Sequence, residues 1–180
     1  ECFWHNDSCF AETPPAACVL HSIELPSDGG NTAFLDMIDA LETLPADLRQ
    51  RIEGRKIRHS LVYTSAGDER PQYAGSTDVT NQPGPEHPII RTLDDSGKQC
   101  LFLGRRLGSY IVGMPLAESE ELLDVLWAHT ISDNRVWSHK WALGDIVIWD
   151  NRTTMHHRDP FDPNQQRRMH KVQVAGGRPT

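Results

Sequence analysis

The alternation of apolar and polar residues along the chain predicts a protein built mainly from short β-strands. Segments 16–25 (AACVLHSIEL), 58–65, 135–141, 145–149 and 168–176 are rich in β-branched and aromatic residues and are bounded by turn-forming residues. Many short strands with few helices favour a barrel or jelly roll over a parallel sheet. We therefore expect a mainly β fold with flanking helices.

Helical spacing is found in two regions. In residues 33–44, apolar side chains recur at three- and four-residue steps, Thr32 can cap a helix there, and Pro45 begins a second short helical turn. Residues 118–131 predict one strong helix with an apolar stripe of leucines and a tryptophan. We expect these helices to lie on the outside of the strands.

Between these elements lie a hairpin and a long aperiodic stretch. Residues 88–93 and 98–104 flank a DDSG turn and predict a β-hairpin. Residues 66–88 are rich in Gly, Pro and Asp, which favours a lid or a mobile loop. No repeat or convincing linker divides the chain, so we expect residues 1–180 to form a single domain.

Composition and charge narrow the function classes. The chain has 180 residues, is 38% hydrophobic and 24% charged, and carries 18 basic against 25 acidic side chains. Because no basic run marks a phosphate-backbone footprint and no apolar stretch approaches the roughly 20 residues that span a bilayer, we expect neither a nucleic-acid nor a membrane partner. The four cysteines form no CxxC pair, which favours the reducing cytoplasm. A homo-oligomer is left open.

The first candidate for chemistry is a histidine and an aspartate at the start of the chain. His5 and Asp7 are two residues apart, so in a strand both side chains point to one face. An imidazole, a carboxylate and one further histidine form the set that holds iron(II) while leaving coordination positions open. An HxD triplet alone is a weak signal, and a third ligand is needed.

Three stretches in order supply that context. FWHNDSCFAETPPA, LPSDGGNTAFLDM and WDNRTTMHHRDPFDPNQQRRMHKVQV together resemble the iron(II)- and 2-oxoglutarate-dependent dioxygenases of the taurine dioxygenase and 2,4-dichlorophenoxyacetate dioxygenase family. The resemblance extends over nearly the whole chain and implies a double-stranded β-helix, a cupin-like jelly roll. Family members usually carry another strand-rich segment ahead of HxD, so we expect this single dioxygenase domain to lack an N-terminal segment.

The resemblance also implies the metal ligands. In the family pattern the distal ligand is the fourth residue after the arginine of WDNR, which here is His156. His5, Asp7 and His156 would then hold Fe(II). His157 would point to the other face of an extended segment and bind no metal.

The same resemblance implies residues for the cosubstrates 2-oxoglutarate and O2. Arg167, eleven residues after His156, would grip the far carboxylate of 2-oxoglutarate with its planar guanidinium, and Thr32 of the GGNT turn would add a hydroxyl group. Arg168 is expected to point away into solvent.

Substrate contacts are expected from three further residues. Where the family usually has a second arginine, four residues past Arg167, this chain has Lys171, which would meet the charged end of a small organic anion. Asn6, between the two proximal ligands, and His59 are additional candidates.

The expected reaction is hydroxylation of an aryloxyalkanoate beside its ether oxygen, followed by ether cleavage. The segments HSLVY, IVGMP and WDNRTTMH resemble the phenoxyacetate branch of the family, although Arg105 and Arg106 stand where that branch would have a substrate-contacting histidine. Three alternatives are kept: a taurine-type dioxygenase that releases sulfite from an alkylsulfonate, a zinc hydrolase with a water in the fourth position, and a non-catalytic jelly-roll metal-binding protein.

Overall fold

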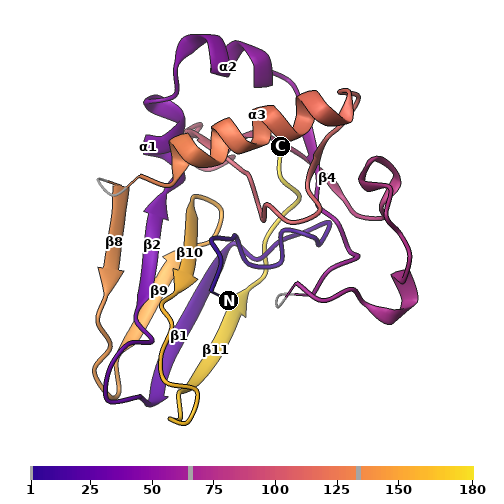
Figure 1. Cartoon of the computed structure of the whole chain (residues 1–180). Coiled ribbons are helices and arrows are strands. Elements are labelled where there is room, and N and C mark those ends of the chain that lie inside the picture. Colours follow the sequence, from indigo (N-terminus) through magenta and orange to yellow (C-terminus); the bar gives the residue numbers. More distant parts are fainter. Residues whose placement is uncertain (1, 65–66, 133–134) are drawn as a thin grey trace.

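The structure is a computed structural model that describes residues 2–64, 67–132 and 135–180. Antiparallel strands dominate the chain, and the α-helices of the described part gather at one end of them (Figure 1). The strands are β1 (Ala17–Glu24), β2 (Thr32–Asp36), β3 (Lys56–Arg58), β4 (Glu86–Pro88), β5 (Ile90–Thr92), β6 (Gln99–Leu101), β7 (Tyr110–Ile111), β8 (Val136–His139), β9 (Ile146–Asp150), β10 (Thr154–Arg158) and β11 (Arg168–Val174). The helices are α1 (Met37–Glu42), α2 (Ala46–Ile52) and α3 (Leu116–Thr130), with 3-10 turns η1 (Pro71–Tyr73) and η2 (Val79–Asn81).

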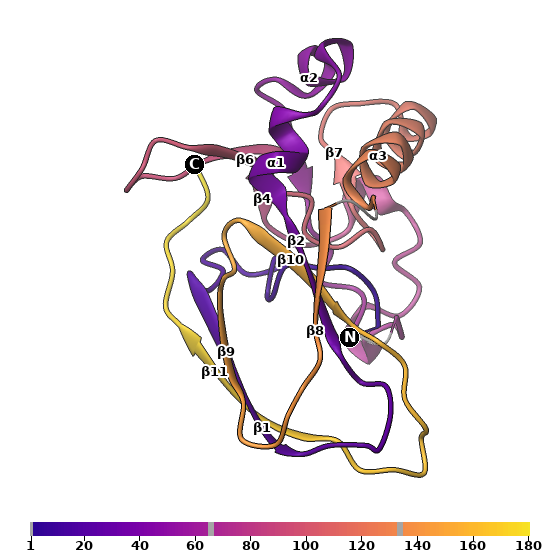
Figure 2. The ribbon, with the colours of Figure 1, turned by 90° about the vertical axis from the view of Figure 1, so that its left-hand side faces the viewer.

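Two three-stranded antiparallel sheets carry the candidate site. One has the order β11-β1-β9 and the other β10-β2-β8, and the two run down opposite sides of the strand layer in Figure 2. Alternate residues of each strand face the space between them, where Cys18, Phe34 and Trp149 form a small buried cluster. The inner faces of the two sheets therefore line a shared interior.

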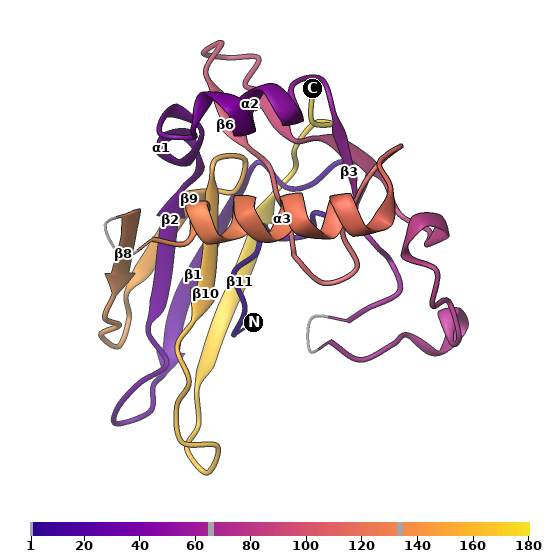
Figure 3. The same cartoon turned by 45° about the horizontal axis from the view of Figure 1, so that its top comes forward.

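A larger core lies on the other side of the β10-β2-β8 sheet. Leu35 and Met155 project from that sheet into a cluster with α1 and the buried face of α3, which crosses the molecule in Figure 3. A third sheet of order β4-β3-β7 and the hairpin β5-β6 complete this half. Among the described helices, none combines the length and apolar character required to cross a membrane.

The mainly β character and most of the predicted elements are confirmed. Strands β1, β8, β9 and β11, the β5-β6 hairpin, and helices α2 and α3 lie within or close to their predicted segments. The stripe of α3 that was predicted to be apolar is buried.

The helix predicted for residues 33–44 is wrong in its first half. Residues Thr32–Asp36 form β2, which pairs with β10 on one side and with β8 on the other. Two full strand ladders outweigh a local helical pattern, because each supplies backbone hydrogen bonds and cross-strand packing. Asp36, rather than Thr32, caps α1 by accepting hydrogen bonds from the backbone N–H groups of Ile38 and Asp39.

The strand predicted for residues 58–65 is also mostly wrong, because β3 ends at Arg58 and Ser65 lies outside the described residues. In the following stretch, which was expected to be a lid or a mobile loop, Ala66 is likewise outside the described part. Residues 67–88 contain η1, η2 and β4, and the last of these pairs with β3. The segment thus has local structure, and its closing over the site stays a hypothesis.

Candidate metal centre

The HxD segment is held against β10 by backbone hydrogen bonds. The N–H of His5 donates to the carbonyl of His156 at 3.1 Å, and the N–H of His156 donates back to His5 at 3.0 Å. On its other side, the N–H of Asn6 donates to the carbonyl of Gly104 at 2.9 Å. This narrow antiparallel bridge places the rings of His5 and His156 side by side, with their centroids 4.3 Å apart.

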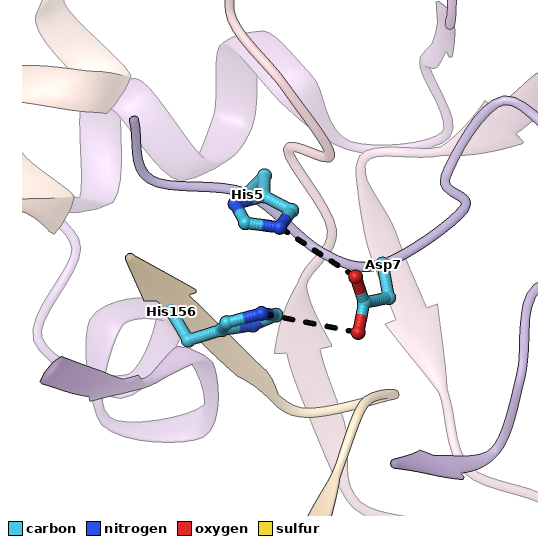
Figure 4. A group of neighbouring side chains, drawn as sticks. All are labelled: His5, Asp7 and His156. Carbon is cyan, nitrogen blue, oxygen red and sulfur yellow. Dashed lines mark ion pairs between the residues drawn. The ribbon is translucent and has the colours of Figure 1, made fainter. Parts of the chain in front are cut away.

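His5, Asp7 and His156 converge on one point (Figure 4). Nε2 of His5 lies 3.6 Å from Oδ1 of Asp7, Nε2 of His156 lies 3.8 Å from Oδ2, and the three ligand atoms are within 4.8 Å of one another. Nδ1 of His5 donates to the carbonyl of Phe3 at 2.8 Å, and this contact orients the ring so that Nε2 faces the carboxylate. Residues 149 positions apart in the chain thus form one group.

Burial and charge prepare these side chains for a cation. All three residues are buried. Burial alone would raise the pKa of Asp7, but His5, His156 and Lys171 outweigh it and hold that pKa well below its usual range. Burial, followed by the proximity of His5, lowers the pKa of His156 well below its usual value. At neutral pH the site therefore offers a carboxylate and a neutral imidazole at His156.

The donor set fits a divalent metal ion such as iron(II). Oδ2 of Asp7 is buried and has no hydrogen-bond partner within the described structure, and an unpaired buried carboxylate oxygen is costly unless a cation meets it. Two imidazole nitrogens and one carboxylate oxygen on one side form the set that holds iron(II) and leaves positions for small ligands.

Asn151 supports this group and was missed as a functional residue in the sequence. Its Oδ1 accepts the backbone N–H of Asp7 at 2.8 Å, and its Nδ2 donates to the carbonyl of Asp7 at 3.1 Å and to that of Pro15 at 3.0 Å. The side chain is fully buried. The asparagine of WDNR thus fixes the backbone of a proposed ligand, and only its place in that motif could have indicated this.

His157 faces away from the group, as predicted. Its ring packs edge-on against Trp4, with centroids 4.3 Å apart, and both line a separate cleft of about 930 Å³ on the other side of the wall made by β10 and the HxD segment. The alternation of β10 accounts for this, since neighbouring residues of a strand point to opposite faces.

The candidate cosubstrate residues lie together on the inner side. Nε of Arg167 donates to the carbonyl of Gly30 at 2.8 Å, and its Nη2 lies 3.5 Å from Oγ1 of Thr32. That hydroxyl oxygen also accepts the indole N–H of Trp141 at 3.0 Å, which leaves the hydroxyl hydrogen for another acceptor. Gly30 has a φ of +67°, and a Cβ there would lie 3.0 Å from Cδ of Arg167, so the GGNT turn needs glycine for this approach.

A cavity of about 370 Å³ connects the two groups. It is lined by His5, Asp7, Leu20, Thr32, His156, Arg158, Arg167, Met169 and Lys171. Arg158 was not singled out in the sequence, although it stands two residues after His156 and the period of a strand places both on one face. Its guanidinium stacks over Phe161 at 4.6 Å, and burial together with the charge of Arg158 lowers the pKa of Arg167.

Lys171 lines the cavity but is engaged by a proposed metal ligand. Its Nζ lies 2.6 Å from Oδ1 of Asp7, so the side chain that was expected to meet substrate contacts the metal centre instead. Arg168, as predicted, points into solvent, where it is 3.7 Å from Glu24.

Asn6 and His59, expected to contact substrate, point elsewhere. The amide of Asn6 donates to the carbonyls of Asn151 and Thr154, both at 3.1 Å, and so holds the turn that precedes β10. His59 is 2% exposed and packs against His87 and Phe102. Neither residue lines the cavity, so the structure gives them supporting positions.

Comparisons with known proteins match the chain along almost its full length. The family model described as "Taurine catabolism dioxygenase TauD, TfdA family" matches residues 1–173. The (S)-phenoxypropionate/alpha-ketoglutarate-dioxygenase of Sphingobium herbicidovorans is 35% identical over 96% of this chain and 62% of that protein. The alpha-ketoglutarate-dependent 2,4-dichlorophenoxyacetate dioxygenase of a Burkholderia species is 34% identical over 97% of this chain and 58% of that protein.

A solved structure agrees with these sequence matches. The crystal structure of AAD-2 in complex with Mn(II) and N-oxalylglycine has a TM-score of 0.86 and 31% identity, and the match covers 99% of this chain and 70% of that one. The chain spans about three fifths of the length of these two dioxygenases.

Proposed function

Because this chain belongs to the taurine catabolism dioxygenase family of TauD and TfdA, we propose that it is an iron(II)- and 2-oxoglutarate-dependent dioxygenase acting on a small organic anion. The observation that carries the proposal is a single cavity that joins the His5, Asp7 and His156 group to Arg167 and Thr32. A zinc hydrolase would need the metal ligands, but it would not need the Arg167 and Thr32 pair beside them.

Each group has a distinct task in this proposal. His5, Asp7 and His156 hold iron(II), and the guanidinium of Arg167 binds the far carboxylate of 2-oxoglutarate, with the Thr32 hydroxyl as a further donor. When bound, iron(II) with 2-oxoglutarate and O2 supplies the oxidising step, in which the cosubstrate becomes succinate and carbon dioxide and a substrate C–H bond is hydroxylated. The protein holds the reactants close together and limits the access of water.

The charges of the cavity support a dianionic cosubstrate. Arg158, Arg167 and Lys171 line it together with the single carboxylate of Asp7. In a partly buried space, these cations would be costly without anions, and 2-oxoglutarate with an anionic substrate would supply them. Arg158 joins Arg167 as a candidate for the cosubstrate carboxylate.

An aryloxyalkanoate is the proposed substrate, and Lys171 the proposed partner of its carboxylate. Two of the relatives are described as phenoxypropionate and 2,4-dichlorophenoxyacetate dioxygenases. Hydroxylation of the carbon beside the ether oxygen would give a hemiacetal that collapses to a phenol and an oxo acid. An alkylsulfonate is the second candidate, supported by the taurine catabolism description of the family, and it would release sulfite.

We also interpret the two facing sheets as the halves of a double-stranded β-helix. The orders β11-β1-β9 and β10-β2-β8 set strands from both ends of the chain beside each other, as expected for a jelly roll. The cavity then opens between its halves, where β1 and β11 contribute one wall and β2 and β10 the other.

Absorption spectroscopy and product analysis test the proposal in two steps. Anaerobic addition of iron(II) and 2-oxoglutarate should give a metal-to-ligand charge-transfer band in the visible range, which a zinc site would not produce. In air, a panel of aryloxyalkanoates and alkylsulfonates should then be screened for substrate-dependent succinate. The absence of both the band and succinate would leave the zinc hydrolase and the non-catalytic metal-binding protein as alternatives.

A further inference from the structure

The contact between Lys171 and Asp7 is the feature that the proposed activity does not explain. Nζ of Lys171 is 2.6 Å from Oδ1 of Asp7, whereas a substrate-binding cation would be expected to face the open part of the cavity. The carboxylate is 8% exposed and the lysine side chain 39% exposed, so the ammonium reaches inward to a buried charge.

Asp7 needs a positive partner whether or not a metal is bound. A buried carboxylate without a compensating charge is costly. The nearest ring nitrogens of His5 and His156 lie 3.6 and 3.8 Å from the carboxylate oxygens. Lys171 supplies a positive charge at hydrogen-bond distance, with its Nζ 2.6 Å from Oδ1.

The two other cations of the cavity are held by different groups. Arg167 donates to Gly30 and lies against Thr32, and the guanidinium of Arg158 stacks over Phe161 and donates to Sγ of Cys2. Lys171 is therefore the cavity cation that neutralises Asp7. Its ammonium is a compact charge on a flexible, partly exposed side chain. It can therefore change partner without breaking the paired hydrogen bonds that a planar guanidinium would make.

We propose that Lys171 is the counterion of Asp7 until a divalent metal takes over that charge, and that metal binding thereby releases the ammonium for the anionic end of the substrate. This rests on the proposed function for the metal and for the anionic substrate. A divalent ion beside Asp7 brings two positive charges close to the ammonium, and their repulsion weakens the Lys171–Asp7 pair. Metal and substrate anion then bind cooperatively, each favouring the other by the same factor.

Manganese titrations test the first half. Mn(II) affinity is measured at pH 7 by the electron paramagnetic resonance signal of the free ion, in the wild type, in Lys171→Met and in the control Arg168→Met. The control removes the same charge from a solvent-exposed position three residues away on β11. Lys171→Met should bind Mn(II) about tenfold more tightly, and Arg168→Met should change little, since an exposed charge is screened.

The opposite result has a definite meaning. If Lys171 merely orients Asp7 for the metal, its removal weakens Mn(II) binding, and the counterion inference is overturned. If the wild type and Asp7→Ala both fail to bind Mn(II), the metal centre of the proposed function falls as well, so the two failures are distinguishable.

Binding of a sulfonate probe tests the second half. Phenylmethanesulfonate is suitable because sulfonates are weak metal ligands, and its affinity is measured by calorimetry with and without saturating Mn(II). The wild type should bind it about tenfold more tightly with Mn(II), which corresponds to a coupling within the usual range. In Lys171→Met that gain should vanish. A gain that persists in Lys171→Met, or no gain in the wild type, overturns the release of the ammonium.

Discussion

Asn151 shows how one side chain outside the proposed ligand set can determine its geometry. Both backbone groups of Asp7 are paired with the amide of Asn151, and this amide also holds the carbonyl of Pro15. Because the HxD segment forms only short bridges with its neighbours, its position depends on such contacts. Asn151 is thus a positioning residue for the proposed metal centre.

Asn151→Ala should destabilise the protein by roughly 2–4 kcal/mol, because buried backbone donors and acceptors are left unpaired. It should also weaken Mn(II) binding, since Asp7 would no longer be fixed. Chemical denaturation and Mn(II) titration measure the two effects. Asn164→Ala, at an exposed turn, is the matched control and should change neither. An Asn151→Ala protein of unchanged Mn(II) affinity would show that Asp7 is positioned by other contacts.

Arg167 and Arg168 are adjacent but differ in burial, so their alanine variants form a matched pair for testing how the cosubstrate is bound. Arg167→Ala should raise the 2-oxoglutarate concentration needed for half-maximal binding by about thirtyfold or more, because removing a charged partner from a partly buried carboxylate costs about 2–5 kcal/mol. Arg168→Ala, exposed beside Glu24, should leave it within about twofold. Titration of the charge-transfer band with 2-oxoglutarate gives both values. Equal losses would mean that general positive charge, not a fitted guanidinium, binds the cosubstrate.

At the scale of elements, the alternation of β10 assigns its two histidines to different faces. His156 lies between the sheets beside Phe34 and Trp149, whereas His157 contacts Trp4 in the other cleft. His156→Ala should therefore abolish Mn(II) binding, and His157→Ala should keep the affinity within a few-fold. Fluorescence should help to follow binding at the first site, since Trp149 touches the ring of His156. Loss of binding in His157→Ala alone would show that the register is wrong.

The sequence predicted those parts of the site that depend on short spacings. The HxD pair, the fourth residue after WDNR and the residues of one face of β11 follow from motif register and a strand period of two. It did not predict β2, because residues 33–44 have helical spacing and only the two partner strands make Thr32–Asp36 extended. The Lys171–Asp7 pair was also unpredictable, since it joins residues 164 positions apart through tertiary contacts.

At the scale of the whole molecule, buried histidines connect the half that holds the metal centre with the half that contains the β4-β3-β7 sheet and the β5-β6 hairpin. His59 packs against His87 and Phe102, and an added Cβ on Gly104 would lie 2.4 Å from its ring. Gly104 in turn accepts the N–H of Asn6, and the ring of His87 donates to the carbonyl of Ala11. The histidine cluster thus supports the loop that carries Asp7.

This cluster should make the free energy of unfolding begin to fall at a pH above the range where carboxylates titrate. Burial, then the charges of His87 and Arg105, lowers the pKa of His59 to about 3, whereas the unfolded chain has the ordinary value near 6.5. Both ring nitrogens of His59 have no hydrogen-bond partner in the described structure, so no acceptor there stabilises the protonated ring. The unfolded state therefore binds the proton more readily, and the stability contributed above about pH 6.5 is lost as the pH falls toward 3.

Chemical denaturation from pH 6.5 to 4.5 should reveal that loss as a steep decrease in the free energy of unfolding, of which His59 contributes about 2–3 kcal/mol. In His59→Leu this proton-binding group is absent, so the loss of unfolding free energy between pH 6.5 and 4.5 should be smaller by that amount. His170→Leu, at an exposed position on β11, is the control and should retain the wild-type slope. If His59→Leu lost as much unfolding free energy as the wild type, the folded protein would accommodate a protonated His59. His59 would then bind a proton equally well in the folded and unfolded states, and its replacement would not change the pH dependence of stability.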